Sequence, residues 1–173
     1  MTCIVEFLCC FIISCNTISY KEKVAKDNIN KEVQIDCVDS VYQGENKYSF
    51  KQIRSEYDFV SIICLQLGCH SCHSQYEKWN ELFKEENCVV LFVVVGANIN
   101  EFKKEFSNYA KIKPFAYIYP DNISELVTRN MLIPWSVFSS TILIDKSNSI
   151  KIIGSPFNSQ KNAKLYHNIC VRK

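Results

Sequence analysis

The chain has 173 residues, of which 47% are hydrophobic and 22% are charged, and this balance excludes a disordered protein. Twenty Lys and Arg residues against eighteen Asp and Glu residues give a net charge of +2, which predicts no binding of nucleic acid. Four glycines and four prolines exclude collagen-like and low-complexity architectures. Ten cysteines are the unusual feature of the composition, and their chemistry depends on the compartment that the protein occupies.

Residues 4–13 form an apolar run that only Glu6 interrupts. The run is too short to span a bilayer but has the length of the apolar region of a secretory signal. It leads into IISC at residues 12–15, which resembles the bacterial lipoprotein box, whose cysteine is acylated after cleavage. We therefore expect a signal peptide over residues 1–14, a lipid anchor on Cys15, and a location in the cell envelope facing the periplasm or the exterior. Simple secretion and a buried N-terminal helix or strand are the alternatives.

The segment 15–32 is polar and lacks hydrophobic periodicity, so we expect it to be a tether, followed by one domain over residues 33–173. An oxidising compartment would permit disulfides in that domain. Its six cysteines are Cys37, Cys64, Cys69, Cys72, Cys88 and Cys170. Buried, inert thiols are expected at Cys64 and Cys88. A structural disulfide between Cys37 and Cys170 is left open.

The first half of the domain is predicted to contain an edge strand within residues 33–42 and a short helix within residues 48–57. Residues 59–67 are almost continuously apolar, which is typical of a strand covered on both faces in a parallel sheet. Residues 72–86 carry large apolar side chains at helical spacing, which predicts an amphipathic helix. These apolar positions are Tyr76, Trp79, Leu82 and Phe83.

The second half begins with another buried strand at residues 89–95. Asn98 followed by Glu101 is a helix-start signature, and the helix that it opens extends to about Ala110. The remaining predicted elements are a strand at 114–119, a short helix at 124–131, a β-hairpin from 141–145 and 150–153, and a helix at 159–170. That last helix is expected to turn Ala163, Tyr166, Ile169 and Cys170 inward.

Strands joined through helices run parallel, because the crossover returns the chain to the same end of the sheet. The predicted hairpin adds an antiparallel strand. The fold class is therefore α/β, with a mixed central sheet, helices on both faces and a β-hairpin before the C-terminal helix.

The sequence Cys69-His70-Ser71-Cys72 lies directly after a predicted buried strand and opens a predicted helix. Unpaired N–H groups and the helix dipole stabilise a thiolate at that point, so a cysteine there is a nucleophile at neutral pH. We expect Cys69 to attack and Cys72, one turn further, to resolve the mixed disulfide. His70 and Ser71 between the sulfurs would tune reactivity, and a protonated His70 would lower the pKa of the Cys69 thiol.

A strand, a CxxC, a helix, a βαβ unit and a hairpin together resemble the thioredoxin-like superfamily, and within it the membrane-anchored TlpA/ResA-like oxidoreductases. The block Ile142-Leu143-Ile144-Asp145, a polar turn and then Ile150-Lys151-Ile152 is similar to the strands that follow that branch's active-site proline loop. The resemblance covers residues 50–170. It implies a thiol–disulfide oxidoreductase without an organic cofactor or a metal. Its implied partners are exported proteins with thiols or disulfides and a membrane redox donor or acceptor.

The chain departs from that pattern at several positions. Gly68 stands where the family has Trp, and Ser71 stands where it has Pro before the second cysteine. The family's cis-proline falls at Ser139, so the substrate-facing loop implied by the resemblance consists of Phe138, Ser139 and Ser140. The buried carboxylate that many relatives carry has no counterpart within residues 59–67.

Other functions of the same cysteines remain open. Cys69 to His73 also fits CxxCH, the attachment motif of a c-type haem, and Cys69, Cys72, His70 and His73 could in principle ligate zinc. The non-enzymatic alternative is a redox-inactive binding module that keeps the CxxC as a structural disulfide. A peroxidase is a further alternative, although no peroxidatic pattern precedes Cys69.

Overall fold

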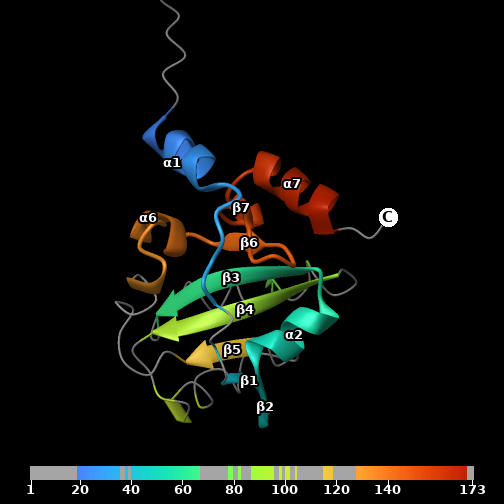
Figure 1. Cartoon of the computed structure of the whole chain (residues 1–173). Coiled ribbons are helices and arrows are strands. Elements are labelled where there is room, and N and C mark those ends of the chain that lie inside the picture. The colour runs from blue at the N-terminus through green and yellow to red at the C-terminus, as the bar shows by residue number, and fades with distance from the viewer. Residues whose placement is uncertain are drawn as a thin grey trace, which may run out of the picture.

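A computed structural model (Figure 1) describes residues 19–35, 38, 40–66, 78–79, 82, 87–95, 98, 100–101, 104, 115–118 and 128–170. Its strands form one mixed sheet in the order β2-β1-β5-β4-β3-β6-β7. These strands are β1 (Val41–Gln43), β2 (Asn46–Tyr48), β3 (Phe59–Gln66), β4 (Cys88–Val95), β5 (Phe115–Ile118), β6 (Ile142–Ile144) and β7 (Ile150–Ile153). The helices that are described over their whole length are α1 (Tyr20–Asn28), α2 (Phe50–Glu56), α6 (Trp135–Phe138), the 3-10 helix η1 (Pro156–Asn158) and α7 (Gln160–Cys170).

The centre of the sheet is parallel, as the sequence predicts. β3 pairs with β4 along its whole length, and β4 pairs with β5 in the same direction. The apolar runs lack alternation because side chains of β3 and β4 are buried on both faces of the sheet. The carboxyl ends of these parallel strands therefore lie at one edge.

Antiparallel hairpins close both ends of the sheet. The predicted hairpin of β6 and β7 is present, and β6 pairs with β3. The hairpin of β1 and β2 at the other end was not predicted, and only the last part of the expected edge strand 33–42 is β1. Gly44, with φ 62°, occupies the first position of the two-residue loop, where a hairpin turn favours glycine.

The expected tether through residue 32 is wrong for residues 20–32. A capping box starts α1, in which the Ser19 side chain accepts from the Glu22 N–H and the Glu22 carboxylate accepts from the Ser19 N–H. The next residues cross the sheet edge, where the N–H of Asn30 donates to the Ile150 carbonyl and Glu32 bridges to Ser149. The polar composition hid this structure, because backbone hydrogen bonds hold a segment with few apolar side chains.

We call residues 29–35 the strap, and two side chains join it to the loop before α6. The side-chain oxygen of Asn130 accepts from the Gln34 N–H at 2.7 Å, and its nitrogen donates to the Gln34 carbonyl at 3.4 Å. The Lys31 ammonium donates to the side chain of Asn28 and to the Leu132 carbonyl, both at 2.8 Å. The N-terminal segment is therefore part of the folded domain.

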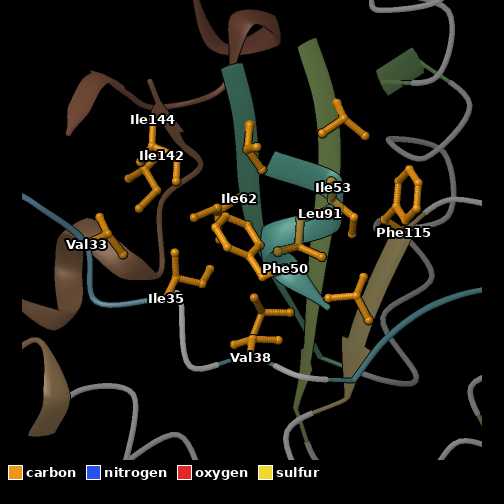
Figure 2. Packing of buried hydrophobic residues seen from close by; sticks show 14 of the residues in the cluster. Val33, Ile35, Val38, Phe50, Ile53, Ile62, Leu91, Phe115, Ile142 and Ile144 are labelled. Carbon is orange, nitrogen blue, oxygen red and sulfur yellow. The ribbon is translucent and has the colours of Figure 1, made fainter. Parts of the chain in front are cut away.

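Buried side chains form one cluster on each face of the sheet. On the first face, Ile35 and Val38 pack with Phe50 of α2 and Ile62 of β3, as Figure 2 shows. The second cluster lies under α7 and includes Trp79 and Tyr166. The side chains of both clusters are shielded from solvent, and this burial of apolar surface holds the covering segments on the sheet.

Three predicted helix starts are confirmed. Ser49 caps α2 with a capping box, and the hydroxyl of Ser159 accepts from the Asn162 N–H at the start of α7. Asn98 and Glu101 exchange hydrogen bonds of 3.0 Å between side chain and backbone. In α7, Tyr166 and Cys170 are buried as expected, but Ala163 is exposed. The helix contacts η1 and the edge strand β7.

Candidate functional site

The sheet edge at the carboxyl ends of β3, β4 and β5 is the candidate functional site. In an open sheet with parallel strands, ligands and catalytic groups gather at that edge. β3 ends at Gln66, so the chain reaches Cys69 three residues beyond the strand. Cys69, His70, Ser71 and Cys72 themselves lie outside the described residues, as does Cys15.

The loop before β6 lies at the same edge. β6 pairs antiparallel to β3 with Ile142 opposite Ile62, so the residues that precede Ile142 run beside the carboxyl-terminal part of β3. Figure 1 shows α6 on the side of the molecule toward which the arrows of β3 and β4 point. The predicted substrate-facing loop is therefore brought to the end of the strand that leads into the CxxC.

This loop is closed by its own hydrogen bonds. The N–H of Ser139 donates to the Trp135 carbonyl at 2.8 Å, and the N–H of Ser140 donates to the Val137 carbonyl at 3.1 Å. The Ser140 hydroxyl donates to the Ser136 carbonyl at 2.9 Å. Ser139 has helical dihedral angles, and no cis peptide bond occurs in the described part of the chain. The main-chain donors of both serines are thus already used inside the loop.

α6 was not predicted, and it is what places these serines. Pro134 is its N-cap, and Val137 is buried in the first cluster while Trp135 is 41% exposed. A proline before an apolar turn is a signal for such a helix start, but four residues are too few for periodicity to show. Packing of Ile133 and Val137 on the sheet stabilises the turn.

The helix predicted over 72–86 is helical at its described residues 78, 79 and 82. Trp79 is 1% exposed and meets Tyr166 edge-to-face at a centroid distance of 5.9 Å and Phe157 at 5.1 Å. The inward orientation of Trp79 follows the predicted helical face. This contact holds the helical residues around Trp79 against α7.

Ser61 is a buried polar residue within β3 that the sequence analysis did not single out. Its exposed fraction is 0%, and its hydroxyl lies near the hydroxyl of Tyr166 of α7. Burial raises the pKa of the Tyr166 hydroxyl, and the neighbouring Ser61 hydroxyl opposes that rise. Its sequence signal was a single hydroxyl residue inside the apolar run 59–67. The pair gives β3 and α7 a polar contact, but it does not replace the buried carboxylate that many relatives carry.

The described thiols outside the CxxC are shielded from solvent to different degrees. Burial raises the pKa of the Cys64 thiol to about 11, so Cys64 is a poor nucleophile at neutral pH. Cys88 and Cys170 are buried in the second cluster. The open alternative of a Cys37–Cys170 disulfide is wrong, because Cys170 is a free thiol.

Within the described ranges, no three His, Cys, Asp or Glu side chains come together as a metal-binding group. His167 lies exposed on α7. The zinc and haem alternatives depend on residues 69–73, which are outside the described residues. A search of the described helices for a membrane-spanning segment finds none of sufficient length and apolar character.

Three solved structures share this fold at low sequence identity. A putative thiol:disulfide interchange protein DsbE from Chlorobium tepidum is 11% identical, with a TM-score of 0.55 over 81% of this chain and 96% of that chain. A putative thiol-disulfide oxidoreductase from Bacteroides vulgatus is 12% identical, with a TM-score of 0.54 over 72% of this chain and 80% of that one. A thioredoxin-like protein from Bacteroides caccae is 15% identical, with a TM-score of 0.52 over 84% of this chain and 52% of that one.

No protein-family model matches the sequence, and no curated protein matches it. At these identities the structural likeness establishes the fold alone. The chain therefore has a thioredoxin-like fold, as the order of its elements predicts.

Proposed function

We propose that this thioredoxin-like chain is a thiol–disulfide oxidoreductase that acts through Cys69 and Cys72. The observation that carries the proposal is the position of the CxxC. The buried parallel strand β3 ends three residues before Cys69, and the helix that contains Trp79 follows it. In a thioredoxin-like fold, such a strand-to-helix junction at the sheet edge exposes a thiolate to a protein substrate.

The proposed reaction is thiol–disulfide exchange. The Cys69 thiolate attacks one sulfur of a client disulfide, the client S–S bond breaks, and a Cys69–client mixed disulfide forms as a client thiolate leaves. The Cys72 thiolate then attacks the Cys69 sulfur and releases the second client thiolate. Two electrons pass to the client, and the chain is left with a Cys69–Cys72 disulfide. The same steps in reverse oxidise a client dithiol.

The proposal includes a location in the cell envelope with a lipid anchor on Cys15, where exported proteins are the clients. A membrane donor or acceptor of the dithiol–disulfide class would restore the starting redox state. The lipoprotein box and the apolar run 4–13 support this location. A substitution of Cys15 that releases the protein from the membrane fraction would support the anchor, and unchanged fractionation would contradict it.

A resolving-cysteine variant tests the reaction. In Cys72→Ala, the mixed disulfide cannot be resolved, so non-reducing gels of cell extracts are expected to show adducts that disappear on reduction. Cys64→Ser is the matched control, because that thiol is protonated within β3 and is expected to trap nothing. The absence of adducts in Cys72→Ala, together with an inactive wild type in insulin reduction, would contradict the enzyme.

A binding module is the second candidate, and the closed loop before β6 favours it. The N–H groups of Ser139 and Ser140 are bonded within the loop and are not offered to a client strand. A module of this kind would bind partners and keep the CxxC as a stable bridge. Insulin reduction by the wild type that is lost in Cys69→Ser would exclude it.

A further inference from the structure

The large apolar side chains exposed around α1 and α6 are unusual for a domain surface. Met131 is 76% exposed, Leu132 is 78% exposed and Trp135 is 41% exposed, and all three lie within five consecutive residues. Tyr20 at the start of α1 is 78% exposed, and α1 contacts α6. We call these four residues the α1–α6 patch. Several large apolar side chains exposed on neighbouring elements are typical of an interaction surface.

The adjacent charges suit an anionic partner. The Lys31 ammonium donates to the Leu132 carbonyl, which places a cation at the base of the patch, and Arg129 is exposed beside Met131. On α1, three lysines outnumber the acidic residues Glu22 and Asp27. The Glu22 carboxylate accepts hydrogen bonds from Ser19. Tyr and Trp side chains combined with cations at the edge of an apolar surface are typical of a membrane–water interface.

The path of the chain brings this patch to a membrane. Ser19, which caps α1, follows the proposed lipid-anchored Cys15 by four residues. Four residues span at most about 14 Å, so an acylated Cys15 would hold α1 against the bilayer surface. α6 contacts α1, so both parts of the patch lie at the end of the domain where α1 begins. The segment between Cys15 and Ser19 is too short to let this end of the domain move far from the bilayer.

We propose that the α1–α6 patch docks on the surface of an anionic bilayer, with Met131, Leu132 and Trp135 entering the headgroup region. This inference rests on the proposed lipid anchor for its geometry but not on the redox reaction. Docking would orient the sheet edge of β3 relative to the membrane. It would therefore favour exchange with a membrane-embedded redox partner, because the loop before β6 follows α6 directly.

Fluorescence of the full chain with Cys15→Ser tests docking separately from acylation. The chain is mixed with vesicles of phosphatidylcholine and phosphatidylglycerol at about 3:1, which carry brominated acyl chains. Trp135 is expected to be quenched and shifted to the blue. Trp79, at 1% exposure, is shielded from the bilayer. Quenching of the tryptophan fluorescence therefore reports contact of the patch with the acyl chains, whereas the amount of protein that sediments with the vesicles reports total binding.

Met131→Ser with Leu132→Ser is the informative variant. Both side chains are exposed, so the fold is expected to be retained, and the quenching is expected to fall at least about five-fold because the apolar contact is lost. Leu165→Ser on α7, another large apolar side chain at 40% exposure, is the matched control and should leave quenching unchanged.

Two results would overturn the proposal. The first is that the protein sediments with vesicles but its tryptophan fluorescence is not quenched. The second is that the double variant is quenched as strongly as the chain without it, and a loss of insulin reduction in that variant would then assign the patch to client proteins instead. The quenching assay uses Cys15→Ser and needs no thiol–disulfide exchange, so it tests only the docking of the patch. The lipid anchor is tested separately by membrane fractionation, and the redox reaction by trapping of mixed disulfides.

Discussion

On the α7 face of the sheet the buried cluster contains hydroxyl and thiol side chains beside its aromatic rings, whereas the buried cluster of the α2 face consists mainly of aliphatic side chains. Ser61, Tyr166, Cys88 and Cys170 all lie on or beside the α7 face, together with Trp79. On the α2 face the strap, α2 and α6 bring together residues from Val33 to Ile150. Trp79 lies ten residues after Cys69 in the sequence and packs on the α7 face, on the same side as the buried hydroxyls and thiols.

The two faces also differ in the way that their covering segments are held. Aromatic contacts of Trp79 with Tyr166 and Phe157 dominate the α7 face. The strap on the other face is held by hydrogen bonds between Asn130 and Gln34 and from Lys31 to the Leu132 carbonyl, in addition to the burial of Val33 and Ile35. Apolar and aromatic burial stabilises the first arrangement, whereas the second combines apolar burial with a few directed polar contacts. Substitutions on each side should separate these contributions.

Trp79→Ala should have the largest effect. It removes a fully buried indole between two aromatic rings, so the free energy of unfolding is expected to fall by about 3–5 kcal/mol. Urea unfolding measures the loss. Trp135→Ala is the control for the loss of an exposed indole and should cost well under half as much. Equal losses in the two variants would show that the α7 face does not depend on this contact.

Asn130→Ala, which acts on the α2 face, should lower the free energy of unfolding by less than Trp79→Ala does. It leaves the N–H and carbonyl of Gln34 without the side chain that bonds both, at a cost of about 1–2 kcal/mol. Hydrogen exchange should rise over residues 29–35 and stay unchanged in α7. Asn158→Ala, at an exposed site, is the control. Unchanged exchange in the strap would mean that Asn130 does not hold it.

Asp145→Asn should lower the free energy of unfolding by an amount that depends on pH. Partial burial alone would raise the pKa of Asp145, but hydrogen bonds from Lys151, Ser147 and Ser149 lower it to about 2, from 3.8. A carboxyl whose pKa is lower in the folded state stabilises the fold above its unfolded pKa. That contribution disappears as pH falls through about 2.

After allowance for solvent screening, the loss in Asp145→Asn at pH 7 is expected to be about 1–2 kcal/mol. Thermal unfolding at pH 7 and near pH 2 measures it, and the difference between wild type and variant should shrink at the lower pH. A difference that does not change with pH would contradict the assigned pKa. Lys151 also donates to Asn30, so this cluster helps to hold the strap.

Ser61→Ala should have the smallest effect. It removes the polar interaction of the Ser61 hydroxyl with Tyr166 inside the α7 face, so the free energy of unfolding is expected to fall by no more than about 0.5–1.5 kcal/mol. A double-mutant cycle with Tyr166→Phe measures the coupling. Additive losses would show that the two hydroxyls do not interact energetically, and the polar character of this face would then contribute little to its stability.

Long, strongly patterned segments of the fold were predictable. The runs that became β3, β4 and β5 have a continuous apolar pattern, and Ser49, Asn98 and Ser159 mark helix starts by side-chain chemistry that acts over three residues. The hairpin of β1 and β2 escaped prediction because its strands are three residues each. Four-residue α6 escaped for the same reason, since periodicity needs more than one turn.

The sequence itself established the order of strands and helices and the position of the CxxC after a buried strand, because both follow from local patterns of apolar side chains. Only the tertiary structure decided that polar residues 20–35 fold onto the sheet edge, since their partners Asn130, Asn148 and Ile150 are about one hundred or more residues away. The same holds for the loop at Ser139 and Ser140. Its place beside β3 depends on the antiparallel register of Ile142 with Ile62, a pairing between distant segments that local preferences do not specify.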